Sequence, residues 1–299
     1  MSLAGRLAIV VITRDRREEL LRTLGELAAL PEPVRTVLVD NASSDGTVEA
    51  VRERFPAVEV VALARNDGAA ARNVGVARLD EPYVAFCDDD SWWQPGALEG
   101  AVALLDDHPR LALVQGHVLV GPDERDDPTC IEMAHSPLPA REGQPGHALL
   151  SFVCCAVVMR RAAFEEAGGF SLRLRIGGEE EIMGHDLAAR GWLQSYVPEL
   201  RAHHHPSKVR DAHGRREVGI RNTLWTTWLR RPAGPAARRT IAVLRRLPRD
   251  RVSARGVGQA LAGLPWVLRE RAPSPPHVEA MQAALEDQQL NSGTRRYVS

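Results

Sequence analysis

Three consecutive aspartates, Asp88, Asp89 and Asp90, follow the apolar run at 84–87 and form the clearest chemical signal in the chain. Adjacent carboxylates repel one another and lose hydration at the end of a buried strand unless a cation neutralises them. Their hard oxygens suit Mg²⁺ or Mn²⁺, which proteins usually hold through one or two carboxylates together with substrate phosphates. The pattern predicts a divalent-metal site for a phosphorylated ligand, with a solvated acidic turn or a helix cap as the alternative.

Two more polar loops follow apolar runs earlier in the chain. Asp40 comes directly after the run at 34–39, where its carboxylate could accept the ring N–H of a bound base. In the loop that starts at Asn66, small residues let a ligand approach the start of a helix, and Arg72 and Asn73 could contact phosphate or ribose. Each loop taken alone is equally compatible with a capping turn.

A glutamate cluster and a histidine cluster lie further downstream. Glu179–Glu181 follows two glycines that free the backbone to begin a helix, where the macrodipole favours carboxylates. His203, His204 and His205 follow a strand predicted near 195–197. Because successive residues of an extended segment point to opposite sides, at most His203 and His205 could face one ligand together, with His205 the favoured candidate. A zinc site and a solvated loop are the alternatives for the histidines.

The first half of the chain alternates between two hydrophobic periods that predict how these groups are positioned. Strands are expected at 7–12, 34–39, 58–63 and 83–87, and helices at 17–30, 47–55 and 68–79. Strands that alternate with helices indicate right-handed, mostly parallel βαβ units with helices on both faces of the sheet. Ligands of such α/β sheets bind beyond the carboxyl ends of the strands, which is where the polar loops lie.

The rest of the chain is less regular. Residues 121–144 are rich in Pro, Asp, Glu and Gly and are predicted to form a mobile loop. The apolar run at 148–159 is too short to cross a bilayer and is predicted to be a buried strand or helix. From about residue 230, arginines alternate with small and aliphatic residues, and prolines divide the stretch into short helices. We interpret 1–232 as one domain and 233–299 as an arginine-rich helical extension.

Composition excludes several classes of function. The 299 residues are 44% hydrophobic and 26% charged, as in a globular protein, and the formal net charge of −1 argues against a nucleic-acid partner. Lys208 is the single lysine, so the chain has no P-loop. The four cysteines lack Cys-x-x-Cys spacing, and no secretory leader precedes the first predicted strand. We therefore expect a cytoplasmic protein with reduced thiols.

Taken in order, the motifs resemble those of glycosyltransferase family 2, whose members have the GT-A fold and use nucleotide-sugar donors. The resemblance covers roughly residues 5 to 232. It rests on Thr13 and on the segments VDNASSDGT, NDGAAARNVG, FCDDD, GGEEEIMGHDLAARGW and RNTLWTTWLRRP.

The resemblance implies a role for each residue at a matching position. Asp40 would lie at the base ring, Asp88 would approach the ribose, and Arg72 would lie beside the ribose and diphosphate. The full set assigned to the nucleotide sugar is Thr13, Arg14, Asp40, Asn41, Asp67, Arg72, Asn73, Asp88 and Asp89. The set assigned to Mg²⁺ or Mn²⁺ is Asp90, completed by His205 or His203.

The catalytic base is implied to be a glutamate. An acceptor attacks from the face opposite the leaving diphosphate, so the base must come from outside the aspartate cluster. Counting back from Gly191 places Glu180 at the family's catalytic position. Because three glutamates stand where the family usually has Glu-Asp, Glu179 and Glu181 stay candidates.

These assignments imply a metal-dependent inverting glycosyltransferase. It would move a sugar from a nucleotide-diphosphate donor, with UDP- or dTDP-sugars favoured, to a hydroxyl or amine of an acceptor that the sequence does not identify. One alternative is a nucleotidyltransferase, although the loop at 13–16 lacks the glycines and lysine typical of that class. The other is a non-catalytic sugar-nucleotide-binding protein. The arginine-rich extension is predicted to contact an anionic membrane surface or a neighbouring subunit.

Overall fold

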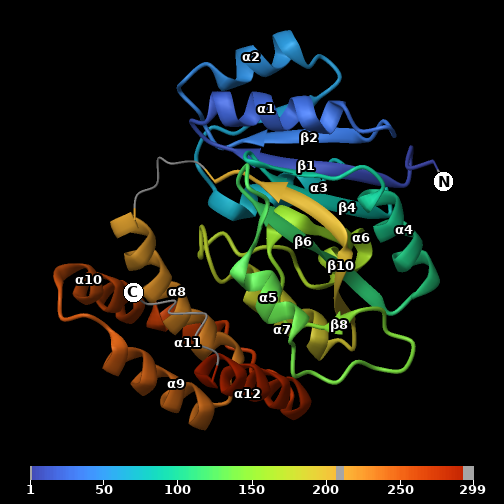
Figure 1. Cartoon of the computed structure of the whole chain (residues 1–299). Helices are drawn as coiled ribbons and strands as arrows, with labels where there is room; N and C mark the ends of the chain where they lie inside the picture. Colours follow the sequence, from blue (N-terminus) through green and yellow to red (C-terminus); the bar gives the residue numbers. More distant parts are fainter. Residues whose placement is uncertain (1, 207–211, 292–299) are drawn as a thin grey trace.

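The computed structural model describes residues 2–206 and 212–291, so Lys208 lies outside the described residues. Within them, one ten-stranded sheet runs through the N-terminal two thirds of the chain, and the C-terminal helices gather beside it (Figure 1). The main path of the sheet is β3-β2-β1-β4-β9-β6-β10-β5, with β7 paired to β6 and β8 paired to β10. The chain is therefore an α/β protein, as the sequence predicted.

The N-terminal half is the predicted parallel arrangement. Its strands are β1 (Leu7–Thr13), β2 (Arg35–Asp40), β3 (Glu59–Ala62) and β4 (Tyr83–Asp88). They are connected by α1 (Arg17–Ala28), α2 (Thr47–Arg54), and the 3₁₀ turn η1 (Gly68–Ala70) that leads into α3 (Ala71–Val76). The register pairs Thr13 with Asp40 and Ile12 with Asp88, so the loops after β1, β2 and β4 leave the same edge of the sheet.

The second half makes the sheet mixed where the sequence predicted mostly parallel strands. It contains β5 (Ser91–Trp93), α4 (Ala97–Asp107), β6 (Leu111–Val120), β9 (Val157–Arg160) and β10 (Leu193–His204). β9 runs antiparallel to β4 and β6, and β5 runs antiparallel to β10, whereas β6 and β10 are parallel. The β5–β10 register sets Ser91 opposite His204 and so brings the histidines beside the aspartates.

The prediction of a mobile loop at 121–144 missed regular structure in this segment. This segment contains β7 (Arg125–Asp126) and α5 (Pro128–Ala134). The Asp127 carboxylate accepts a hydrogen bond from the backbone N–H of Thr129, and Pro128 occupies the first turn, where proline is favoured. Cys130 is fully buried and Met133 nearly so. The run at 148–159 is buried as predicted, around β8 (His147–Ala148), the turn η2 (Cys154–Ala156) and β9.

Apolar cores lie on both faces of the sheet. One core takes its helical side chains from α1, α2, α4 and α5, and the other takes them from α3, α6 (Arg161–Glu166) and α7 (Glu179–Ala189). The helices after the sheet are α8 (Ala212–Arg230), α9 (Ala233–Arg246), α10 (Arg251–Ala262), α11 (Leu264–Arg269) and α12 (Pro276–Asn291). α8–α11 share a third core around Trp225 and Val267. In the described part of the chain, no helix is both long and apolar enough to span a bilayer.

Candidate active site

Asp89 and Asp90 lie nearly buried in the turn between β4 and β5, and Arg16 supplies their counter-charge. Arg16 Nη1 lies 2.9 Å from Asp89 Oδ1 and 3.4 Å from Asp90 Oδ2. The Thr13 hydroxyl donates a hydrogen bond to Asp89 Oδ2 at 3.0 Å, and the Thr23 hydroxyl donates to the Asp89 carbonyl. Burial raises the pKa of Asp89 to about 7, although the Arg16 charge opposes this shift. The sequence analysis did not identify Arg16, because nothing local showed that the loop after β1 reaches these carboxylates.

The histidine that reaches the aspartates is His204. Its Nε2 lies 3.3 Å from Asp90 Oδ1, whereas the rings of His203 and His205 lie against Trp92, at centroid distances of 5.4 and 4.7 Å. Neighbouring histidines therefore alternate, as expected for an extended segment, but the pair favoured for the metal faces the tryptophan. Strand β10 continues to His204, beyond the short strand predicted near 195–197, and its register with β5 decides which side each ring takes.

Arg72 connects the aspartate turn with the glutamates. It is almost fully buried at the start of α3, and it forms an ion pair with the carboxylate of Asp88. Burial opposes the Arg72 charge, but the nearby groups Cys154, Asp88 and Glu179 outweigh burial and raise the pKa of Arg72 further above its already high value. Arg72 is thus a permanent positive charge between the two acidic clusters.

Glu179 and Glu180 form an acidic pair at the first turn of α7, with Glu179 buried and Glu180 half-buried. Burial raises the pKa of Glu179 to about 8, and the Glu180 charge adds to this shift while Arg72 opposes it. Burial also raises the pKa of Glu180, against a hydrogen bond with Cys154 and the Arg72 charge. Glu179 Oε2 is buried and has no hydrogen-bond partner among the described residues. Glu181 lies apart from this pair, because its Oε2 accepts a hydrogen bond from Thr226 Oγ1 at 3.4 Å.

The loop before the glutamates is fastened to α8. Asn222 Nδ2 donates to the carbonyls of Leu174, Ile176 and Gly177 at 2.9, 2.9 and 2.6 Å. At Gly178 the backbone has φ +90°, and a Cβ would lie 2.9 Å from Thr226 Cγ2. A glycine is required there for both reasons. Helix α8 thus determines where the first turn of α7 presents its carboxylates.

Asp40 closes the loop after β2 with one carboxylate oxygen and leaves the other unpartnered. Asp40 Oδ2 accepts a hydrogen bond from the backbone N–H of Ser43 at 2.9 Å. Asp40 Oδ1 is buried and has no hydrogen-bond partner among the described residues. Asn41 joins this loop to the next one, because its Oδ1 accepts from the N–H of Asp67 at 3.0 Å and its Nδ2 donates to the Gly68 carbonyl at 3.3 Å.

Two residues assigned to the nucleotide sugar make other contacts. Arg14 is half exposed and lies against its neighbour Asp15, with 3.3 Å between Arg14 Nε and Asp15 Oδ2. Asn73 Nδ2 donates to the Phe170 carbonyl at 2.8 Å, and its Oδ1 accepts from the Phe170 N–H at 2.9 Å. The amide of Asn73 therefore holds the turn before Phe170. The local sequence gave no signal for this contact between segments almost a hundred residues apart.

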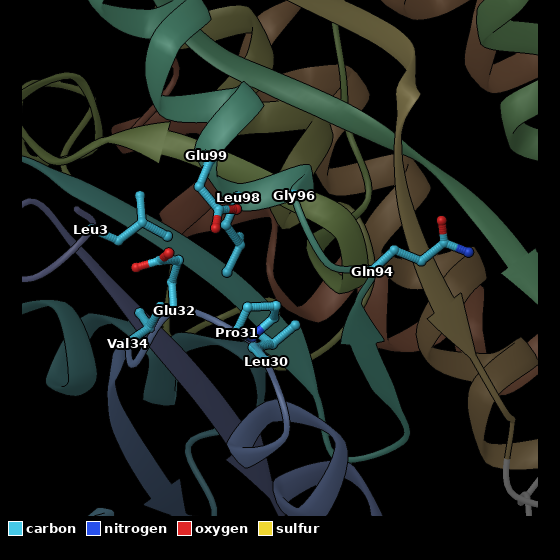
Figure 2. A pocket seen from close by; sticks show the side chains of 9 residues that line it. All are labelled: Leu3, Leu30, Pro31, Glu32, Val34, Gln94, Gly96, Leu98 and Glu99. Atoms are coloured by element: carbon cyan, nitrogen blue, oxygen red, sulfur yellow. The ribbon is translucent and has the colours of Figure 1, made fainter. Parts of the chain in front are cut away.

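A small hollow lies away from these carboxylates, between the N-terminus, the α1–β2 connection and the start of α4 (Figure 2). Its walls are largely aliphatic, with Leu3, Leu30 and Leu98 among them. Glu32 and Glu99 also line it, and no basic side chain among its lining residues offsets their charge, so it would repel a nucleotide diphosphate.

Comparison with known proteins decides the family. The family model described as glycosyl transferase family 2 matches residues 8–168, more than half of the chain. The chain belongs to glycosyl transferase family 2. Its matched segment contains Asp40, Arg72 and the aspartates at 88–90, while the glutamates at 179–181 and α8 follow it. Family membership and the named relatives together show that the protein is a glycosyl-transferring enzyme.

Two similar curated family 2 proteins come from Mycobacterium tuberculosis. The chain is 28% identical over 236 residues to an N-acetylglucosaminyl-diphospho-decaprenol L-rhamnosyltransferase, covering 67% of this chain and 76% of the relative. It is 28% identical over 213 residues to a pre-mycofactocin glycosyltransferase, covering 68% of this chain but only 43% of the relative. The chain thus spans most of the first relative and less than half of the second.

Solved structures show that this family 2 chain has the GT-A fold. The mannosyltransferase PcManGT from Pyrobaculum calidifontis, in complex with GDP-Man and Mn²⁺, superimposes with a TM-score of 0.60 at 19% identity, covering 95% of this chain and 87% of that one. GalNAc-T7 with UDP, GalNAc and Mn²⁺ gives a TM-score of 0.60 at 14% identity, covering 89% and 56%. The fold predicted from the sequence motifs is confirmed.

Proposed function

We propose that the protein is a metal-dependent inverting glycosyltransferase that moves a sugar from a nucleotide-diphosphate donor to a hydroxyl or amine of an acceptor. One observation carries the proposal: two acidic clusters of different character meet around Arg72. The aspartate cluster at 88–90 is compensated by Arg16 and Arg72. In the glutamate pair at 179–180, partial or full burial raises the pKa of both carboxyl groups. The first suits the leaving diphosphate, and the second suits proton removal from an acceptor.

Asp90 and His204 are the residues we propose as metal ligands. The 3.3 Å between Asp90 Oδ1 and His204 Nε2 is close to the separation of about 3 Å between neighbouring ligands of an octahedral ion with ~2.1 Å bonds. No group of three potential ligand side chains is found in the described residues, and the donor phosphates would supply further oxygen ligands. When bound, Mg²⁺ or Mn²⁺ would stabilise the negative charge of the leaving diphosphate. The Mn²⁺ complexes of structurally similar transferases support this proposal.

Asp40 is the residue we propose to read the nucleotide base. It is 1% exposed, and its Oδ1 has no hydrogen-bond partner among the described residues, which is costly for a buried carboxylate. A ring N–H of uracil or thymine would satisfy this oxygen, so UDP- and dTDP-sugars are the favoured donors. Guanine also has a ring N–H, and similar structures contain either GDP-Man or UDP. Asn41 and Asp67 hold the loop on which the base would rest.

Glu180 is the residue we propose as the general base. A base works best when its pKa is near the working pH, and burial raises the pKa of Glu180 in that direction. Glu180 is only half-buried, whereas Glu179 is buried and Glu181 contacts α8. Glu180 can therefore accept the acceptor's proton while attack occurs on the face opposite the diphosphate. Glu179 would keep the site's charge low by holding a proton.

We also propose that residues 1–232 form the transferase domain and that 233–299 extend and brace it. Arg231, at the end of this domain, pairs with Glu279 and Glu286 of α12 at 2.6 Å each. His185 of α7 lies within hydrogen-bonding distance of Ser274 and Gln282.

All four cysteines are unpaired and buried, which supports the proposed cytoplasmic location.

The proposal is tested by thermal-shift measurements with UDP, dTDP and GDP, each with EDTA and with Mn²⁺. A ligand at a hundredfold excess over its Kd should add about 2.7 kcal/mol of stability, a shift that is readily measured. Stabilisation by one diphosphate, larger with Mn²⁺ and reduced in Asp40→Asn and in Asp90→Ala, is the expected result. No stabilisation by any nucleotide under either condition would reject the donor site.

A further inference from the structure

The charged residues of helices α9–α11 are almost all positive. Residues 233–269 contain eight arginines and one acidic residue, Asp250, which caps α10 and pairs with Arg216. Six exposed arginines form no ion pair within the described residues, and they belong to α9, to α10 and to the connection between the two helices. These are Arg238, Arg245, Arg246, Arg249, Arg251 and Arg255. Such a concentration of unpaired positive charge attracts an anionic partner.

The same helices expose large aliphatic side chains. Leu261 and Leu268 are 60% and 57% exposed and lie seven residues apart across the α10–α11 junction, so they share one side of two nearly continuous helices. Ile241 and Leu244 of α9 are also exposed, three residues apart, while Ala236 and Val243 of the same helix are buried. The helices therefore have a second apolar line in addition to the one that packs on α8.

The exposed apolar surface continues onto the loop that leads to the glutamates. Leu172 and Ile176 of this loop are 54% and 53% exposed. The loop is tied to α10 and α11, because the Arg173 guanidinium lies 4.9 Å from the Trp266 ring centroid and Arg221 bridges the Leu174 carbonyl and Gln259. Of the seven large apolar side chains exposed in the described residues, six belong to this loop and α9–α11, and only Ile131 lies elsewhere.

We propose that α9–α11, with the loop at 172–176, form a docking surface for an anionic phospholipid bilayer. Helices that combine exposed aliphatic side chains with basic flanks bind the boundary between headgroups and acyl chains. The aliphatic side chains enter that boundary, and the arginines contact lipid phosphates. A second copy of the chain fits less well, because a symmetric contact would set arginines against arginines.

Docking in this way has a consequence for catalysis that rests on the proposed function. The docking surface includes the loop whose carbonyls Asn222 holds, immediately before Glu179 and Glu180. Binding a bilayer would bring the acceptor side of the site close to the lipid surface. The docking itself does not depend on metal, donor or glutamate chemistry, so it can be tested without any of them.

The test is vesicle flotation with the full-length protein in the absence of donor and metal. Vesicles of phosphatidylcholine with phosphatidylglycerol are compared with vesicles of phosphatidylcholine alone, at low and high salt. The variants are Leu261→Ser/Leu268→Ser and Arg245→Gln/Arg246→Gln, with Ile131→Ser as the matched control for an exposed aliphatic residue elsewhere. Circular dichroism and thermal unfolding establish that each variant is folded.

We expect salt-sensitive binding to the anionic vesicles only. Each arginine removed should weaken binding about fivefold, the double leucine variant should also bind weakly, and Ile131→Ser should bind like wild type. Equal binding to both vesicle types, no binding to either, or normal binding by both double variants would overturn the proposal. Sedimentation in the absence of vesicles identifies the rival: a dimer that the same variants abolish would make this surface a subunit interface.

Discussion

Arg16 Nη1 lies 2.9 Å from Asp89 Oδ1, in a site where nearly buried carboxylates would otherwise face one another without a counter-ion. The same nitrogen lies 3.4 Å from Asp90, the proposed metal ligand. Arg16 and a divalent cation thus compete for the same negative charge. A metal that binds together with a nucleotide diphosphate also gains the phosphate oxygens as ligands. A metal that binds alone must displace the arginine from the carboxylates. We therefore expect Mn²⁺ to bind wild-type protein tightly only together with the nucleotide.

Replacing Arg16 tests this competition. Arg16→Ala removes the arginine charge beside Asp89 and Asp90. Binding of Mn²⁺ in the absence of nucleotide should therefore strengthen by about tenfold, which is a modest part of the Coulomb energy at this distance. Without metal, the variant should unfold at a lower temperature than wild type. Isothermal titration with Mn²⁺ measures the first effect, and Arg14→Ala, whose side chain contacts Asp15, is the control. Weaker Mn²⁺ binding by Arg16→Ala would show that Arg16 supports the metal instead of competing with it.

Replacing His204 and His205 one at a time distinguishes the metal ligand indicated by the structure from the one favoured on sequence alone. Mn²⁺ is expected to increase the affinity for UDP or dTDP, and His204→Ala should reduce this gain by about tenfold or more. The size of the effect corresponds to the loss of one hydrogen bond to a charged group. His205→Ala should leave this gain unchanged, because the ring lies against Trp92. Calorimetric titrations with EDTA and with Mn²⁺ measure both, with Asp90→Ala as the reference for complete loss. The reverse ranking of the two histidines would restore the sequence-based assignment.

Local sequence patterns predicted the parallel half of the sheet because each signal lies within a few residues. The strand that contains Val10 and Val11 is a β-branched run buried on both faces, and the helix that follows places leucines at helical spacing. The polar loops after β1, β2 and β4 then had to meet at one edge. The candidate site was predicted to this extent from motifs alone, and their order also indicated the family.

Contacts between distant segments could not be predicted in the same way. Which histidine faces Asp90 depends on the antiparallel register of β5 with β10, a pairing across more than a hundred residues. The ion pairs of Arg16 depend on how the loop after β1 folds over the turn after β4. Helix α5 is a different case, because Asp127 followed by Pro128 is a local N-terminal signal that the polar composition of the segment concealed.

Glu180 should be essential for transfer but not for donor binding. Glu180→Gln keeps the shape of the side chain but cannot accept a proton, so transfer should fall by ~10²–10⁴-fold while the Kd of the nucleotide diphosphate stays near the wild-type value. Sugar transfer to an acceptor and nucleotide binding are measured on the same preparations. Glu179→Gln and Glu181→Gln are compared in parallel. An inactive Glu179→Gln or Glu181→Gln beside a nearly normal Glu180→Gln would move the base by one position, and near-normal transfer by all three would exclude a carboxylate base.

Asn222 should matter for catalysis although it lies behind the site. Asn222→Ala removes the donors to three carbonyls of the loop before Glu179, which should cost about 1–3 kcal/mol of stability and lower kcat more than donor affinity. Chemical unfolding and steady-state kinetics measure the two effects. Gln259→Ala, which removes an exposed partner of Arg221, is the control. A variant that loses stability but keeps kcat would show that Asn222 supports the fold without positioning the glutamates.

Glu179 should make folding stability depend on pH even without donor. The folded state keeps the Glu179 proton up to a pKa of about 8, whereas the unfolded chain releases it near the ordinary value of 4.5. Between these values the folded state binds more protons, so stability is greatest at the acidic end and falls as pH rises through the folded pKa. Asp89, with its pKa raised to about 7, contributes in the same direction, so the slope of wild type alone cannot assign the effect to Glu179.

The comparison with Glu179→Gln isolates that contribution. Glutamine stays neutral, so the variant should be more stable than wild type at pH 8 by at least the value of one pKa unit, about 1.4 kcal/mol, and the difference should shrink towards pH 5. Urea unfolding at a series of pH values measures it. Glu53→Gln, at an exposed position of α2, should leave the dependence unchanged. If the difference between Glu179→Gln and wild type is the same at pH 5 and pH 8, Glu179 does not hold its proton in the folded protein, and the acidic pair must share its charge in another way.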